Sequence, residues 1–274
     1  MLQLRMIARL GEACRGDERV SGALMFGSFT TGEGDAFSDI EFALFIRDDA
    51  FEGFGQRAWL DAVSPVAAYF PDDFGHHTAL FENGVRGEFH FMRAGDVSVV
   101  AGWRGNGWFP SLDAAVLVDR TGELSRHAAA LVGGPPAREG AALVEGLALN
   151  LLNLTLLGAN LLNRGELARA WALLSGVHGN LLKLVRLREG VTGHWPTPSR
   201  ALERDLSAAA YERYVTCTAG ARPDELCAAY RESWRWSREL FRDVAGPLGV
   251  HLPATVIAQV EKLLGEAPAC SNVR

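Results

Sequence analysis

The first half of the chain carries short apolar runs of the kind that form strands. Two of them flank Asn83-Gly84, and an Asn-Gly pair between alternating apolar runs is the strongest short signal for a β-hairpin. Helical spacing of apolar residues appears at the N-terminus and again after residue 57, where Pro65 interrupts it. We predict strands over residues 22–26, 39–46, 78–82, 85–92 and 115–118, and helices at the N-terminus and over 57–70.

Leucines at helical spacing dominate the second half. The segment Gly-Gly-Pro-Pro at residues 133–136 ends any regular element, and beyond it apolar residues recur at i, i+3 and i+4. We predict helices over residues 139–163, 166–188, 224–244 and 253–264. The pattern therefore predicts an α+β protein, in which an α/β domain with a mixed sheet spans residues 1–134 and an all-α domain spans 135–274.

Composition excludes several classes of protein. The formal net charge is −6 and the only lysines are Lys183 and Lys262, which argues against a nucleic-acid partner. We see neither a signal peptide nor an 18-residue apolar run free of charge, so we expect no membrane span. The chain has four cysteines, Cys14, Cys217, Cys227 and Cys270, and none of them shows CxxC spacing. We therefore expect buried, reduced thiols in the cytoplasm.

The stretch GSFTTGEGDAFSDIEFALFI, residues 27–46, carries the candidate chemistry. Asp39 and Glu41 are spaced i and i+2, so on a strand they share a face about 7 Å apart. Two like charges about 6 Å apart repel by roughly 3 kcal/mol at an effective dielectric near 20. We therefore expect a cation between them, and carboxylates without a nearby thiol favour Mg²⁺.

Two further features extend this site. Gly27 lets backbone approach a ligand closely, and the Ser28 hydroxyl suits a phosphate oxygen, although no Gly-Lys-Ser/Thr follows and a P-loop is excluded. Glu88 lies in an apolar strand, with His90 on the same face, and needs a partner there. A phosphate-binding turn with three carboxylates suits metal-assisted nucleotidyl transfer, in which one carboxylate accepts the proton of the attacking hydroxyl.

These residues match a known pattern. Gly-Ser at residues 27–28 followed by Ser-Asp-Ile-Glu at 38–41 resembles the signature of the DNA polymerase β-like nucleotidyltransferase superfamily. The segments FGSFTTGEGDAFSDIEF, RGEFHF and NRGELARAWALLSGVHGNLLKLVR are similar to the lincosamide nucleotidyltransferases, from the N-terminal helix to about residue 265.

The resemblance implies an N-terminal nucleotidyltransferase domain, a C-terminal helical domain and a homodimeric enzyme. Such an enzyme transfers AMP or another nucleoside monophosphate from ATP or another NTP to a hydroxyl of lincomycin or clindamycin, which confers antibiotic resistance. By position, Asp39, Glu41 and Glu88 become the Mg²⁺ ligands, with Glu88 as general base, and Gly27 and Ser28 hold the β- and γ-phosphates.

Residue 31 departs from the family, because the resemblance suggests a lysine near Thr31. Related enzymes also grip the triphosphate with polar residues on a helix, and Asn180, Lys183 and Arg186 share or border one face of a predicted helix. Lys183 is our candidate nucleotide-binding residue there, and an ordinary solvated face is the alternative.

Simpler interpretations compete at several positions. Glu88 could pair with Arg86 on its own strand, and we expect His90 to be a packed strand residue. His76 and His77 are expected in an exposed turn without a metal. Among the tryptophans, Trp171, Trp234 and Trp236 suit the core or a dimer contact, whereas Trp103 and Trp108 suit the core or an acceptor pocket equally.

Two alternative functions stay open. The first is the same chemistry on an aminoglycoside or another hydroxylated small molecule, since the residues of an acceptor pocket follow no readable code. The second is a non-catalytic nucleotidyltransferase-like antitoxin or binding module, against which the presence of all three carboxylates argues.

Overall fold

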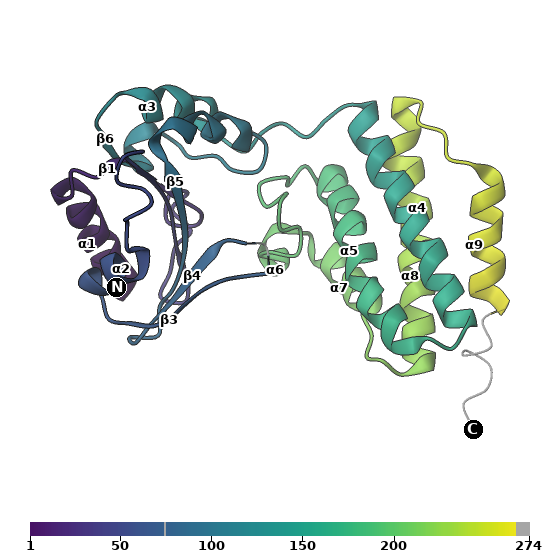
Figure 1. The fold of residues 1–274 in the computed structure, drawn as a ribbon. Helices are drawn as coiled ribbons and strands as arrows, with labels where there is room; N and C mark the ends of the chain where they lie inside the picture. Colours follow the sequence, from purple (N-terminus) through teal and green to yellow (C-terminus); the bar gives the residue numbers. More distant parts are fainter. Residues whose placement is uncertain (74, 267–274) are drawn as a thin grey trace. The chain divides into compact units, whose positions relative to one another are not determined.

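The structure is a computed structural model that describes residues 1–73 and 75–266 (Figure 1). The chain divides into two compact units, Met1–Pro136 and Ala137–Arg274. The first is built on a mixed sheet and the second is helical, so the predicted α+β fold is confirmed.

A six-stranded sheet in the order β3-β4-β5-β2-β1-β6 forms the centre of the first unit. β2 and β5 are parallel neighbours, and every other neighbouring pair is antiparallel. The strands are β1 Val20–Phe26, β2 Ile40–Ile46, β3 Val66–Pro71, β4 His77–Phe81, β5 Arg86–Arg93 and β6 Val116–Asp119.

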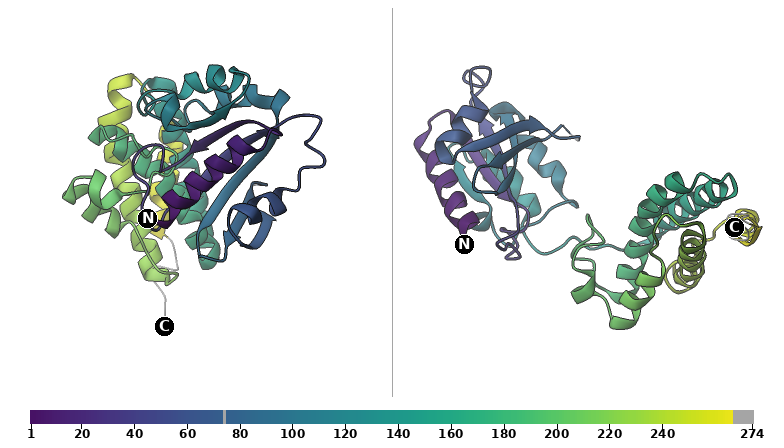
Figure 2. Two further views of the ribbon diagram at one scale, coloured as in Figure 1. Left: turned by 90° about the vertical axis from the view of Figure 1, so that its left-hand side faces the viewer. Right: turned by 90° about the horizontal axis from the view of Figure 1, so that it is seen from below.

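Helices cover both faces of this sheet. On one face α1 (Leu2–Gly16) and α2 (Gln56–Val63) pack against alternate residues of β2 such as Phe42 and Leu44, and Figure 2 shows α1 in purple lying across the strands. On the other face α3 (Glu123–Ala128) and the 3₁₀ segment η1 (Ala94–Trp103) pack against Phe45 and its neighbours. Because strand side chains alternate, Glu41 lies on this second face.

The segment after α2 corrects one prediction. The helix expected over residues 57–70 ends at Val63, and the edge strand β3 begins at Val66. Pro65 lies between them, and a proline disfavours the helical conformation of the residue before it. The hairpin prediction is confirmed: β4 and β5 pair antiparallel across Asn83-Gly84, with Gly84 at φ +84°.

The second unit packs four long helices together. α4 (Ala141–Asn163) contacts α5 (Leu167–Glu189), α8 (Pro223–Leu240) and α9 (Ala254–Glu266), and α5 also contacts α8 (Figure 1). All four were predicted, although α8 ends in a π-helical turn, Phe241–Ala245, within the range expected to be α-helical. Two short helices between α5 and α8 were not predicted: α6 (Leu202–Asp205) and α7 (Ala208–Thr216).

Helix α4 also corrects the expectation about membranes. By length and composition alone it could cross one, because Glu145 is its only charged residue and its other polar residues are asparagines and a threonine. One such helix is weak evidence, since the core helix of a globular domain passes the same test. Here Leu151, Leu152, Ala159 and Leu162 of α4 pack into the core of the helical unit.

The cysteines only partly follow the expectation of reduced thiols. Cys14 and Cys217 are free and buried. Cys227 is disulfide-bonded, so the expectation is wrong for this residue, whose spacing in the sequence gives no sign of a bridge. Cys270 lies outside the described residues.

Candidate functional site

The parallel pairing of β2 with β5 brings two of the predicted carboxylates side by side. Glu41 is the register partner of Glu88, and Ile40 is the partner of Gly87. Neighbouring strands lie about 4.8 Å apart and paired residues project to the same face. Asp39 comes two residues before Glu41, ahead of the first residue of β2. The amino ends of two adjacent strands therefore supply Asp39, Glu41 and Glu88.

Gly27 makes room for one of these carboxylates. It follows the last residue of β1, Phe26, which pairs with Glu41 across the sheet. A Cβ atom at Gly27 would lie 1.4 Å from Glu41 Oε2, and its φ of +75° favours glycine in any case. The sequence predicted that a ligand approaches the backbone at Gly27 closely. In this structure the Glu41 side chain occupies that position.

Local hydrogen bonds stabilise the turn after Gly27. Thr30 donates to the Gly27 carbonyl from its hydroxyl at 2.7 Å, and the Glu33 N–H donates to the Ser28 carbonyl at 2.9 Å. The Thr31 hydroxyl, at the position where the resemblance suggests a lysine, also donates to the Ser28 carbonyl, at 3.2 Å. No helix opens here, so the turn offers no helix dipole to a phosphate.

Ser28 has a buried hydroxyl that no other described group satisfies. Leaving such a group unpaired costs about 1–3 kcal/mol. An oxygen of a bound ligand would remove this cost, which is the observation in this turn that points to a ligand.

Arg86 places a guanidinium beside Asp39 and Glu88, whereas the cation predicted from the sequence was Mg²⁺ between Asp39 and Glu41. Its Nη1 contacts Asp39 Oδ2, and its Nη2 lies 3.6 Å from Glu88 Oε2. The alternative pairing of Arg86 with Glu88 is thus present, but the shorter contact is with Asp39. The Arg86 guanidinium bridges the two carboxylates and reduces their repulsion.

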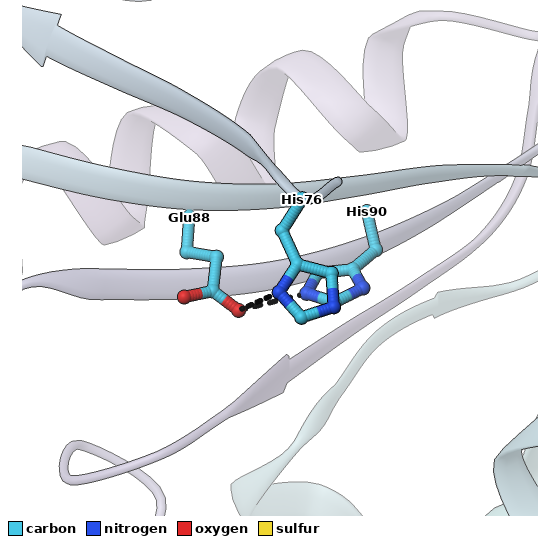
Figure 3. Close-up of side chains that lie close together, drawn as sticks. All are labelled: His76, Glu88 and His90. Atoms are coloured by element: carbon cyan, nitrogen blue, oxygen red, sulfur yellow. Dashed lines mark hydrogen bonds and ion pairs between the residues drawn. The ribbon is translucent and has the colours of Figure 1, made fainter. Parts of the chain in front are cut away.

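Glu88 also lies against two imidazoles (Figure 3). His90 Nε2 is 2.9 Å and His76 Nδ1 is 3.6 Å from Glu88 Oε1, and the two rings lie 4.4 Å apart between centroids. The hydrogen bond from His90 is the main cause that holds the pKa of Glu88 below its ordinary value, against the opposing effect of burial. Glu88 is therefore ionised at neutral pH, and it is a weaker base than an ordinary glutamate.

The two histidines depart from their expected roles. His90 packs as predicted, with ring centroids 5.4 Å from Phe26 and 6.3 Å from Trp103, but it also bonds Glu88. His76 lies between the bend at Gly75 and β4 and is partly exposed, yet it contacts Glu88. The exposed turn expected for His77 is wrong, because His77 is the first residue of β4. The register of the hairpin could have predicted the contact between His76 and Glu88. Thr78 pairs with Glu88, and residue 76 lies two positions from Thr78 on the same face.

The polar residues predicted to share one face of α5 have different surroundings in the structure. Arg186 is fully buried and donates to the carbonyls of Pro198, Val191 and Arg200 and to Asp205 Oδ2. Its assignment to triphosphate binding is therefore wrong, since its donors hold the loop after α5.

Lys183 remains half-buried on the same helix, with its Nζ 5.6 Å from the centre of the Trp195 ring. Arg138 lies 5.3 Å from the same ring. Nucleotide binding by Lys183 rests on the resemblance and stays a prediction.

Most of the helical unit matches a family model. Residues 140–263 match the family model described as lincosamide nucleotidyltransferase-like, C-terminal domain. This segment is therefore similar to that family, and the resemblance predicted from the sequence is confirmed over this part of the chain. No curated protein sequence matches the chain.

Two solved structures resemble the chain weakly. One is an aminoglycoside 6-adenyltransferase from Bacillus subtilis, with a TM-score of 0.44, 14% identity and coverage of 96% of each chain. The other is a nucleotidyltransferase-like protein from Exiguobacterium sibiricum, with a TM-score of 0.37, 13% identity and coverage of 94% of this chain and 89% of that one. These scores are too low to support an argument about the substrate.

Proposed function

We propose that the protein is a Mg²⁺-dependent nucleotidyltransferase that transfers AMP from ATP, or another nucleoside monophosphate from its NTP, to a hydroxyl of a lincosamide such as lincomycin or clindamycin. The observation that carries the chemistry is the parallel register that sets Glu41 beside Glu88, with Asp39 and Gly27-Ser28 next to them. The lincosamide class is supported by the family of the helical domain. Transfer to the drug would confer resistance.

The residues present fit Mg²⁺. Asp39, Glu41 and Glu88 offer hard carboxylate oxygens, which this ion prefers, and the buried Ser28 hydroxyl is unsatisfied beside them. In our proposal these three carboxylates hold the ion. Bound there, Mg²⁺ would neutralise the charge of the triphosphate.

The chain's own side chains divide the remaining tasks. Ser28 donates its hydroxyl to a phosphate oxygen of the nucleotide. Glu88 accepts the proton of the attacking drug hydroxyl, whose oxygen forms a bond to the α-phosphorus while the bond to the β-phosphate breaks and pyrophosphate leaves. The hydrogen bond of Glu88 to His90 fixes the orientation of the carboxylate. The edge-on packing of Phe26 on the His90 ring keeps that imidazole in place.

The test is turnover with ATP, Mg²⁺ and a panel of lincosamides and aminoglycosides, followed by mass spectrometry of each drug. We expect an AMP adduct on clindamycin or lincomycin. An adduct only on an aminoglycoside would refute the lincosamide assignment, and absence of NTP-dependent turnover with every acceptor would favour a binding module.

Matched variants test the carboxylates. We expect Asp39→Asn to abolish transfer, because the amide removes a negative charge from the proposed metal site. Asp113→Asn, which changes an exposed carboxylate in the same unit, should keep it. Full activity of Asp39→Asn would refute the metal assignment.

The resemblance also supports a homodimer. Light scattering after size-exclusion chromatography should give twice the mass of one chain, and a monomer that turns over normally would refute the dimer.

A further inference from the structure

Three side chains on one face of the hairpin bring ligand atoms together. His76, Glu88 and His90 each offer one ligand atom, and these atoms all lie within 4.8 Å of one another (Figure 3). Within residues 1–73 and 75–266 no other group of three histidine, cysteine or acidic side chains meets this condition. The group is different in kind from the carboxylates proposed for Mg²⁺, because two of its three donors are imidazole nitrogens.

The fold holds these side chains in place before any ion binds. Glu88 and His90 are two residues apart on β5, and both belong to the sheet face that η1 and α3 cover farther along. The bend that presents His76 is closed by Asp72, whose carboxylate accepts the His76 N–H at 2.9 Å and whose N–H donates to the His76 carbonyl at 2.7 Å. The ring of His90 is supported by Phe26.

The spacing of the donor atoms matches the demands of a small tetrahedral cation. Bonds of about 2.0–2.1 Å in a tetrahedral site set neighbouring ligand atoms roughly 3.3 Å apart. Glu88 Oε1 lies 2.9 Å from His90 Nε2 and 3.6 Å from His76 Nδ1. The third separation, between the ligand atoms of His76 and His90, is within 4.8 Å, so rotations that bring the two imidazoles closer would surround an ion.

We propose that His76, Glu88 and His90 form a site for a transition-metal cation of the Zn²⁺ type, with water completing its coordination. Imidazole nitrogens favour Zn²⁺ and its first-row neighbours over Mg²⁺. Three protein ligands with one open position are typical of exchangeable and catalytic zinc sites. The Glu88 carboxylate offsets half of the charge of the ion.

The free thiols do not compete for this ion. Burial raises the pKa of Cys14 to about 12 and that of Cys217 to about 11. Both stay protonated at neutral pH, whereas a thiol binds a metal as its thiolate. The neighbouring His77 faces elsewhere, because its ring stacks on Tyr69 at 5.2 Å between centroids.

The site shares Glu88 with the proposed transfer chemistry. Zn²⁺ bound by the two histidines would withdraw this carboxylate, so micromolar Zn²⁺ should inhibit transfer even with millimolar Mg²⁺ present. This consequence, unlike the binding itself, rests on the proposed function.

The test is titration of tag-free, chelator-treated protein with ZnCl₂ by calorimetry, followed by Co²⁺ substitution and visible spectroscopy. We expect one strong site and Co²⁺ bands typical of nitrogen–oxygen coordination. His76→Ala and His90→Ala should each weaken Zn²⁺ binding by at least about 10-fold, since even loss of an outer-shell partner commonly costs 10- to 100-fold. His77→Ala should bind like the wild type.

A further variant and a folding measurement distinguish loss of Zn²⁺ binding from loss of the fold. His90→Gln preserves the size and polarity of the side chain, and thermal unfolding with circular dichroism shows whether each variant is folded. Wild-type affinity in folded His76→Ala and His90→Gln would overturn the site.

Asp39→Asn separates the two proposals, because it removes a proposed Mg²⁺ ligand and leaves all three zinc ligands. We expect it to bind Zn²⁺ normally whether or not the protein transfers nucleotides. Loss of Zn²⁺ binding in folded Asp39→Asn would place the ion among the carboxylates and overturn the histidine site.

Discussion

Two glycines in the turn after β1 have the same backbone conformation and different surroundings. Gly27 has φ +75° and Gly32 has φ +77°. A Cβ at Gly27 would overlap the Glu41 carboxylate, whereas a Cβ at Gly32 would meet nothing within 4 Å. An alanine at either position bears the left-handed strain of about 1–2 kcal/mol, but only Gly27→Ala also displaces Glu41.

This pair of variants isolates the placement of Glu41. We expect Gly32→Ala to lose stability and keep most of its kcat/KM, whereas Gly27→Ala should lose on the order of 100-fold in kcat/KM, because a displacement of about 1 Å can cost that much. Turnover with ATP, Mg²⁺ and clindamycin and thermal unfolding measure the two effects. Equal loss of kcat/KM in both variants would contradict the role of Gly27.

At the scale of helices, Gly158 lets α4 approach α8. A Cβ there would lie 2.1 Å from Cε1 of Tyr230, a fully buried side chain whose hydroxyl donates to the Ala170 carbonyl of α5 at 2.8 Å. The ring cannot retreat without losing that hydrogen bond. Gly158 therefore sets the packing of three helices.

We expect Gly158→Ala to lower the free energy of unfolding of the helical unit by about 1–3 kcal/mol through overpacking. The control is Gly146→Ala on the same helix, where a Cβ meets nothing within 4 Å and the better helix propensity of alanine should add about 0.5–1 kcal/mol. Urea unfolding followed by circular dichroism measures both changes. A gain in stability for Gly158→Ala would contradict this account.

The buried Arg186 ties α5 to the loop that follows it, and its partner Asp205 makes this link sensitive to pH. Burial raises the pKa of Asp205, but hydrogen bonds from His194 and Arg186 outweigh this effect and hold the pKa below the ordinary value of 3.8. A carboxyl whose pKa is lower in the folded state stabilises that state above about pH 4. The contribution is lost as the pH falls through the folded-state pKa.

We therefore expect the helical unit to lose stability as the pH falls below about 4, and Asp205→Asn to lose less over the same interval. At neutral pH the variant should be less stable by about 3–5 kcal/mol, because it leaves a buried guanidinium without its anion. Urea unfolding at several pH values measures both effects. The same pH dependence in the wild type and in Asp205→Asn would assign the acid sensitivity to other carboxyls.

At the scale of the whole molecule, each unit has cores of its own. The cluster that contains Leu151, Leu181 and Trp236 belongs to the helical unit, and the clusters on the two faces of the sheet belong to the first unit. We expect residues 137–274 expressed alone to keep a helical circular dichroism spectrum and to unfold cooperatively. A fragment without cooperative unfolding would show that the helical unit needs residues 1–136.

Local patterns predicted most of the elements and part of the site. The Asn83-Gly84 hairpin and the four long helices follow from turn chemistry and from leucine spacing, which act between near neighbours. The helix expected over residues 57–70 was wrong because Pro65 divides a short helix from an edge strand whose partner, β4, determines its conformation. The burial of Arg186 was missed because its acceptors come from a loop without periodicity.

The sequence by itself determined which residues are candidates for chemistry. Alternation along a strand places Glu88 with His90 on one face of β5, and it predicted the same for Asp39 and Glu41, although β2 begins only at Ile40. Only the tertiary structure decided that β2 and β5 are neighbours, that Arg86 bridges Asp39 and Glu88, and that His76 meets Glu88 and His90. The physical reason is that side-chain direction along a strand is a local property of the backbone. The pairing of strands is decided by burial and hydrogen bonding among segments far apart in the chain.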